Sequence, residues 1–208
     1  MKKILLLGDS IRIGYDKSVR LSLEGVAEVV FPEENCRFAS YLLRYFHEYL
    51  NTLAHGKADI ICWNAGLWDC LRLFEEEPHT PVEHYTFMIE RICRRIKKLC
   101  PDARVIFSTS TTVQSEKMDK DFKRYNEEIA AYNEAALSVV KQYGFEVCDL
   151  FTVSQGLSDA AHSDPVHYYT PEGTEAFTKA LLSHLAPILG EKEILYREVI
   201  HVKAPVGI

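Results

Sequence analysis

A serine near the N-terminus and a histidine near the C-terminus are of the types that nucleophilic acyl transfer requires. Ser10 follows Gly8-Asp9 at the end of the apolar run Lys3–Leu7. A serine hydroxyl is a weak nucleophile and needs a base, usually a histidine held by a carboxylate. His167 follows Asp164 by three residues, a spacing at which both side chains can face the same way. The three residues predict a Ser-His-Asp triad, although Gly8-Asp9-Ser10 alone also fits a helix N-cap or a turn.

Two further segments could supply donors to the negative oxygen that develops during acyl transfer. Asn64 follows the apolar run Asp59–Trp63 and carries a side-chain amide, although asparagine is also a common turn residue. The segment Glu33-Glu34-Asn35-Cys36-Arg37 opens a predicted helix, where free backbone N–H groups can point at an anion.

The chemistry-bearing residues lie between short apolar runs and longer segments of helical period. The predicted strands are Lys3–Leu7, Ala27–Phe31, Asp59–Trp63, Arg104–Ser108 and Phe145–Leu150. Such continuous apolar runs are typical of strands buried on both faces. Helical stripes occur within Phe38–Leu50, at Tyr85, Ile89, Ile92, Ile96 and Leu99, at Phe122, Tyr125, Ile129, Tyr132, Ala136 and Val139, and at Phe177, Leu181, Leu185 and Ile188. This alternation predicts a three-layer α/β domain with a five-stranded parallel sheet, whose ligands bind beyond the carboxyl ends of the strands.

Composition narrows the class of protein. The chain has 208 residues, of which 47% are hydrophobic and 26% charged, which is typical of one globular domain. Its net charge of −6 argues against a broad nucleic-acid surface, because phosphate binding needs a basic face. The apolar runs are too short for a membrane span or a signal peptide, so we expect a cytoplasmic protein with no membrane partner. The six cysteines form no C-x-x-C pair, so we expect neither a metal site nor a disulfide framework.

Three blocks of sequence together resemble the SGNH (GDSL) hydrolase superfamily, which is named for Ser, Gly, Asn and His in four blocks. They are Gly8-Asp9-Ser10, Asn64-Ala65-Gly66-Leu67-Trp68-Asp69 and Asp164-Pro165-Val166-His167. The match in block order runs from Lys3 to about Leu189. The resemblance implies a flavodoxin-like α/β/α sandwich and the activity of an esterase, lipase, thioesterase or carbohydrate acetylesterase. It implies no cofactor.

The same resemblance assigns roles to individual residues. Ser10 matches the nucleophile, His167 the base and Asp164 its orienting acid, and the backbone N–H of Ser10 would be one oxyanion donor. The second block usually offers a glycine, and Cys36 is the best match, so its N–H would be the second donor.

The third block departs from the family pattern Gly-x-Asn-Asp. It reads Gly66-Leu67-Trp68-Asp69, so Trp68 replaces the asparagine, and Asn64 becomes the candidate side-chain donor. We expect the neighbouring residues to belong to the substrate pocket: Asp9, Asn35, Gly66 and Trp68.

The leading hypothesis is a serine ester hydrolase that acts on a small-molecule ester through an acyl-enzyme on Ser10. By family analogy its acyl group is short, and a carbohydrate acetyl ester is one option. The alternatives are a lysophospholipase or thioesterase of the same fold, and a non-catalytic binding domain, which the Trp68 departure motivates. A nucleotide or phosphate binder is disfavoured, because G-x-G-x-x-G and a P-loop lysine are absent. Three arginines after strand ends could meet a substrate carboxylate or phosphate, or could be exposed, solvated charges: Arg12, Arg37 and Arg72.

The domain boundary is expected after Gly190. Residues 1–190 would form the hydrolase domain, and residues 191–208 a C-terminal extension of unknown role. This extension holds the strand-like run Val199-Ile200-His201-Val202. It could add an edge strand, pack on the domain as a tail, or form a contact between subunits of a homo-oligomer.

Overall fold

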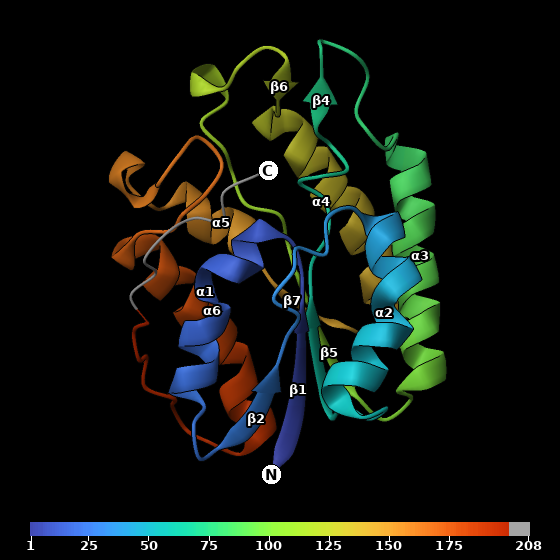
Figure 1. The fold of residues 1–208 in the computed structure, drawn as a ribbon, viewed down its shortest axis with the longest axis vertical. Coiled ribbons are helices and arrows are strands. Elements are labelled where there is room, and N and C mark those ends of the chain that lie inside the picture. The colour runs from blue at the N-terminus through green and yellow to red at the C-terminus, as the bar shows by residue number, and fades with distance from the viewer. Residues whose placement is uncertain (200–208) are drawn as a thin grey trace.

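The centre of the molecule is a five-stranded parallel sheet with the strand order β2-β1-β3-β5-β7 (Figure 1). The computed structural model describes residues 1–199. The strands are β1 (Lys2–Leu7), β2 (Ala27–Val30), β3 (Ile60–Trp63), β5 (Arg104–Ser108) and β7 (Glu146–Cys148). In the register, Leu5 of β1 lies between Val30 of β2 and Ile61 of β3. The three central strands β1, β3 and β5 are buried on both faces over most of their length, as their continuous hydrophobic sequences predict.

Helices cover both faces of this sheet (Figure 1). On one face α1 (Ser10–Ser22) packs against α6 (Pro171–Leu189), and the short α5 (Leu150–Gln155) packs beside α6. On the other face α3 (Val82–Leu99) lies between α2 (Ala39–Ala54) and α4 (Asn126–Val140). The predicted three-layer α/β/α sandwich is thereby confirmed.

The segment before α4 differs from the sequence prediction. Phe122 was expected on a helical stripe, but Phe122–Lys123 forms β6, which pairs antiparallel with β4 (Arg72–Leu73) above the carboxyl edge of the main sheet (Figure 1). Tyr125, expected on the same stripe, caps α4 and is 40% exposed. Apolar residues at helical spacing continue through this segment, but the pairing of β6 with β4, which is distant in the chain, overrides that local period.

The described part of the C-terminal segment runs along α1. The backbone N–H of Arg197 donates to Ser22 Oγ at 2.8 Å, and its guanidinium pairs with Glu24 at 2.9 Å. The N–H of Val199 donates to Ser18 Oγ at 3.1 Å. Residues 191–199 therefore fit a tail packed on the domain. The rest of the strand-like run, residues 200–202, lies outside the described residues, and the boundary at 190 and the oligomer contact stay predictions.

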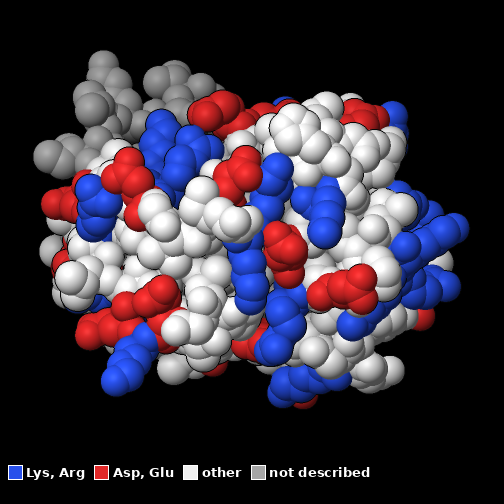
Figure 2. All heavy atoms as spheres, turned by 90° about the horizontal axis from the view of Figure 1, so that it is seen from below, with Lys and Arg blue, Asp and Glu red and all other residues white. Residues whose placement is uncertain are grey.

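Three findings bear on the expected class of protein. All six cysteines are free and buried. Within residues 1–199, no helix is long and apolar enough to cross a membrane, and no three His, Cys, Asp or Glu side chains gather in a way that could hold a metal ion. Figure 2 views the end of the molecule at which the strands begin, and there Lys and Arg are interspersed with Asp and Glu. That face is therefore not a uniformly basic surface.

Candidate active site

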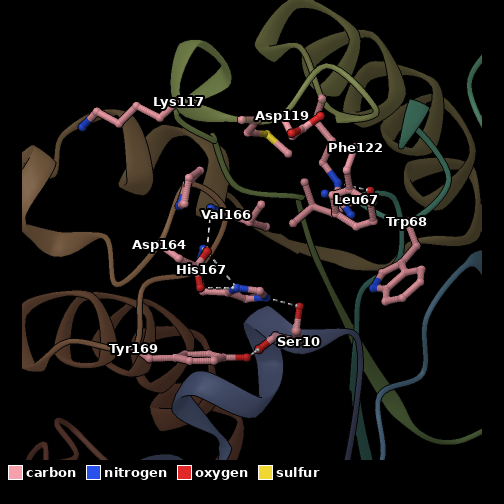
Figure 3. Close-up of a pocket in the computed structure, with 13 residues that line it drawn as sticks. Ser10, Leu67, Trp68, Lys117, Asp119, Phe122, Asp164, Val166, His167 and Tyr169 are labelled. Carbon is pink, nitrogen blue, oxygen red and sulfur yellow. Dashed lines mark hydrogen bonds and ion pairs between the residues drawn. The ribbon is translucent and has the colours of Figure 1, made fainter. Parts of the chain in front are cut away.

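The turn between β1 and α1 places Ser10 at the carboxyl edge of the sheet. A Cβ on Gly8 would lie 1.9 Å from Oδ1 of Asn64, so this turn has room only for glycine. Asp9 caps α1, because its Oδ1 accepts the N–H of Ile11 at 3.0 Å. Ser10 is thus the first residue of the helix, and its hydroxyl faces the loop that precedes α6 (Figure 3).

The loop before α6 brings His167 and Asp164 to this hydroxyl. Nε2 of His167 lies 2.7 Å from Ser10 Oγ, and Nδ1 lies 2.8 Å from Asp164 Oδ2 (Figure 3). Asp164 Oδ1 also accepts the N–H groups of Val166 and His167, both at 2.9 Å, which folds the loop around the carboxylate. Burial raises the pKa of Asp164, but the hydrogen bonds from His167 and from these two backbone groups outweigh it and lower the pKa to about 2. The structure thus brings the predicted triad together around an ionised carboxylate.

Tyr169 holds the imidazole from the other side, and sequence reasoning missed it. Its ring stacks on His167 with a centroid distance of 4.9 Å and an angle of 25° between the planes. Its hydroxyl donates to the backbone carbonyl of Ser10 at 2.5 Å (Figure 3). The ring also lies against Gly14 of α1, where an added Cβ would be 2.6 Å from two ring carbons. Tyr169 therefore links His167 to the helix that carries Ser10.

Gly14→Ala should lower kcat by about 10- to 100-fold, because the new methyl group must displace the Tyr169 ring that positions His167. Alanine also favours a helix over glycine by roughly 0.5–1 kcal/mol, so a loss of stability should be small. Steady-state kinetics and thermal unfolding, with Ser183→Ala on the exposed face of α6 as a control, measure both effects. An unchanged kcat in Gly14→Ala would contradict a role of Tyr169 in positioning His167.

A cavity of about 360 Å³ opens beside the triad (Figure 3). Its wall is mainly apolar and is built from the third sequence block, the loop that leads into β6, and the loop before α6. The lining residues beside the triad are Leu67, Trp68, Lys117, Met118, Asp119, Phe122, Arg124, Pro165, Val166 and Tyr169. The predicted pocket residue Trp68 is thereby placed in the cavity wall, whereas Asp9, Asn35 and Gly66 are not among the lining residues.

The two predicted backbone oxyanion donors differ in whether their N–H groups are already hydrogen-bonded. The N–H of Ser10 lies in the first turn of α1, where the helix has no acceptor for it. The N–H of Cys36 donates to the carbonyl of Gly8 at 3.0 Å, because the second loop is tied to the end of β1. It is therefore engaged in this structure, contrary to the prediction that it faces the reaction centre. Oδ1 of Asn35 accepts the N–H of Arg37 at 2.7 Å and thus shapes this loop.

Three residues of the third sequence block pack around the turn and helices that carry the site, and do not line the cavity. Asn64 is 5% exposed and packs against Gly8 outside the cavity lining. A Cβ on Gly66 would lie 2.4 Å from Ser110 Oγ, so this glycine permits close packing. Asp69 is fully buried, and its Oδ2 accepts the N–H of Ala39 at the start of α2 at 3.0 Å.

Asp69 should make stability depend on pH. Burial raises its pKa to about 7, despite the hydrogen bond from Ala39, whereas an unfolded chain has an aspartate pKa of about 3.9. Because the folded state holds this proton more tightly, the contribution is fully present below about pH 3.9 and is lost as the pH rises through about 7. Asp69→Asn cannot titrate. Urea unfolding should show the variant gaining stability relative to the wild type from pH 4 to 8, by at most about 4 kcal/mol; a difference independent of pH would contradict this.

Two of the three arginines that are candidates for substrate contacts, Arg12 and Arg72, are engaged elsewhere, and the third, Arg37, is exposed. Arg12 is buried, not exposed; it pairs with Asp16 and donates to the carbonyl of Pro32 at 2.8 Å. Arg72 pairs with Glu128 at 2.6 Å. The arginine that does line the cavity, Arg124, was not singled out from the sequence, because its segment was assigned to a helical stripe.

Comparisons with known proteins agree with this fold. Residues 6–176 match the GDSL-like Lipase/Acylhydrolase family. Among curated proteins, the chain is 28% identical over 211 residues to the human isoamyl acetate-hydrolyzing esterase 1 homolog, covering 91% of this chain and 82% of that protein. It is 26% identical over 178 residues to the rice GDSL esterase/lipase WDL1, where the match covers 81% of this chain but only 60% of the rice protein.

Solved structures show the same fold at low identity. A lipase/acylhydrolase from Enterococcus faecalis superposes with a TM-score of 0.70 at 18% identity, covering 96% of this chain and 100% of that one. An acetylxylan esterase from Geobacillus stearothermophilus gives a TM-score of 0.70 at 17% identity, covering 94% and 97%. The chain belongs to the GDSL-like lipase/acylhydrolase family of the SGNH superfamily, a family of carboxylic ester hydrolases.

Proposed function

We propose that this protein hydrolyses a small-molecule ester through an acyl-enzyme on Ser10. The observation that carries the proposal is the unbroken chain of hydrogen bonds from Ser10 Oγ through both ring nitrogens of His167 to Asp164, at the wall of a cavity. A base within 2.7 Å of a serine hydroxyl, itself oriented by a third group, is the arrangement that activates a serine nucleophile.

Each residue of this chain has a chemical task. With Asp164 ionised, Nδ1 of His167 carries the proton that it donates to the carboxylate, so the lone pair of Nε2 faces the Ser10 hydroxyl. Nε2 takes the hydroxyl proton as Oγ attacks the ester carbonyl, and then gives that proton to the leaving alcohol. Water, activated by the same nitrogen, releases the acid and restores Ser10.

The negative oxygen of the tetrahedral intermediate needs hydrogen-bond donors. The Ser10 N–H at the start of α1 is the proposed first donor, and the helix dipole adds to its effect. The Asn64 amide remains the proposed side-chain donor. Its Oδ1 packs against the Gly8 turn that presents Ser10, so the donating group would be the Nδ2 at the other end of the same amide. Cys36 has no part in this mechanism, because its N–H is held by Gly8.

We infer a short acyl group. The apolar side chains of Leu67, Trp68 and Phe122 line a cavity of only about 360 Å³, which suits a small ester. Acetate esters also figure in the names of two similar proteins, the human isoamyl acetate-hydrolyzing esterase 1 homolog and the bacterial acetylxylan esterase. A carbohydrate acetyl ester remains one option within this proposal.

A panel of 4-nitrophenyl esters with acyl chains from two to twelve carbons tests the acyl preference. We expect kcat/KM to be highest for chains of two to four carbons and to fall for longer ones. A maximum at eight carbons or more would overturn the short-chain proposal and favour a lysophospholipase or thioesterase.

A further inference from the structure

Arg124 brings a buried cation to the wall of the cavity that holds Ser10. The side chain is 2% exposed, and it lies in the short connection between β6 and α4. Its Nε donates to the carbonyl of Leu67 at 2.5 Å, which fixes the guanidinium against the third sequence block. Its Nη1 is buried and has no hydrogen-bond partner among residues 1–199.

The charge of this guanidinium is not neutralised within the part of the chain that the structure describes. Across residues 1–199, no carboxylate lies within 4.0 Å of Arg124, whereas the buried Arg12 is paired with Asp16. Burial lowers the pKa of Arg124, and the charges of Cys70, Asp9 and Asp164 oppose this only in part. Asp9 caps α1 and Asp164 holds His167, so both have other partners.

An unpaired buried charge is unfavourable, and a protein keeps one mainly where another molecule completes it. The Phe122 ring, 5.2 Å from the guanidinium carbon, offers a partial cation–π contact, but it leaves the N–H donors of Nη1 without acceptors. A planar guanidinium with parallel N–H donors fits the two oxygens of a carboxylate or phosphate.

We propose that Arg124 forms a subsite for an anionic group, a carboxylate or a phosphate, carried by the ester substrate of Ser10. The inference rests on the proposed function and deepens it. Because Arg124 and Ser10 line one cavity of about 360 Å³, the anion and the scissile ester belong to one small molecule. Asp119 also lines this cavity, but its side chain is exposed, so its charge is screened by water.

Two matched ester pairs test the subsite and show which side of the ester carries the anion. On the acyl side, mono-4-nitrophenyl glutarate is compared with 4-nitrophenyl pentanoate. On the alcohol side, 2-acetoxyethyl phosphate is compared with 2-hydroxyethyl acetate. In at least one pair we expect the wild type to prefer the anionic ester. Arg124→Gln should lower kcat/KM for that anionic ester by about 10- to 100-fold. The neutral ester should change by less than about 5-fold, and Arg124→Lys should restore part of the preference.

Lys120→Gln is the matched control, because Lys120 is an exposed lysine on the same loop, paired with Glu75, and lies outside the cavity lining. Lys120→Gln should leave kcat/KM unchanged for all four esters of the two pairs. Equal losses on charged and neutral esters in Arg124→Gln, or no preference in the wild type, would overturn the subsite and leave Arg124 a structural role only. If Arg124→Gln does not fold, the wild-type comparison tests the subsite: a preference for the anionic ester supports it, and no preference overturns it.

Calorimetry separates this inference from the proposed function. Glutarate and inorganic phosphate are titrated into the wild type and into Ser10→Ala. Binding of either anion that Arg124→Gln or Arg124→Lys weakens would support the subsite even if no ester were hydrolysed. Hydrolysis of neutral esters, with no binding of either anion, would overturn the subsite and leave the proposed function standing.

Discussion

Ser10→Ala should lower kcat for 4-nitrophenyl acetate by on the order of 10⁶-fold, to the residual level that binding and oxyanion contacts provide. The reason is chemical: the lone pair of His167 Nε2, which lies 2.7 Å from Ser10 Oγ, would then have no hydroxyl to deprotonate. Stability should change little, because the Ser10 side chain makes this single hydrogen bond. Burst-free kinetics and an unchanged unfolding temperature would together show that only the chemistry is lost.

Ser110→Ala is the matched control for this experiment. Ser110 is a buried serine that does not line the cavity, and within the described part of the chain its Oγ has no hydrogen-bond partner. Its loss should leave kcat within about 2-fold of the wild type. Activity of Ser10→Ala within 10-fold of the wild type would place the nucleophile elsewhere and refute the proposed mechanism.

Asp164→Asn should lower kcat by about 10⁴-fold while the loop keeps its shape. The asparagine Oδ1 can still accept the N–H groups of Val166 and His167, but its amide would donate to Nδ1 where the carboxylate accepts. The imidazole proton would then reside on Nε2, which removes the base from Ser10. Because Asp164 has a pKa of about 2, the wild-type carboxylate is ionised above pH 4, and the deficit should persist across that range.

Asp159→Asn provides the control, since Asp159 is an exposed carboxylate near the same loop and pairs with Lys117 on the surface. Such a surface pair contributes little, so this variant should retain nearly full activity. An Asp164→Asn enzyme that kept more than a tenth of the wild-type kcat would show that the carboxylate does not orient His167 for catalysis.

The positions of Ser10, Asp164 and His167 could be predicted because their signals are local. Apolar runs identify the strands, and residues that follow buried parallel strands meet at one edge of the sheet. The Asp-x-x-His spacing similarly places a carboxylate beside the imidazole within a single turn of loop. These signals do not depend on knowing how distant segments pack.

The supporting contacts could not be predicted, because they join segments far apart in the chain. The Cys36 N–H is engaged only because its loop returns to Gly8, a backbone contact that no residue type signals. The Tyr169 ring packs against Gly14, which lies 155 residues earlier in the chain. A glycine inside α1 is the sequence feature that indicates a close contact at this position. The burial of Arg124 could not be predicted, because charged residues are expected at the surface. It depends on the pairing of β6 with the distant β4 and on the carbonyl of Leu67.

The most direct test of the central claim is to treat the folded protein with a fluorophosphonate and map the modified residue by peptide mass spectrometry. We expect one phosphonyl adduct, on Ser10, formed rapidly in the wild type and absent from Ser10→Ala, with labelling strongly slowed in Asp164→Asn. A folded wild-type protein that never labels, or an adduct on any other residue, would contradict a Ser10 nucleophile activated by His167 and would favour a non-catalytic binding domain.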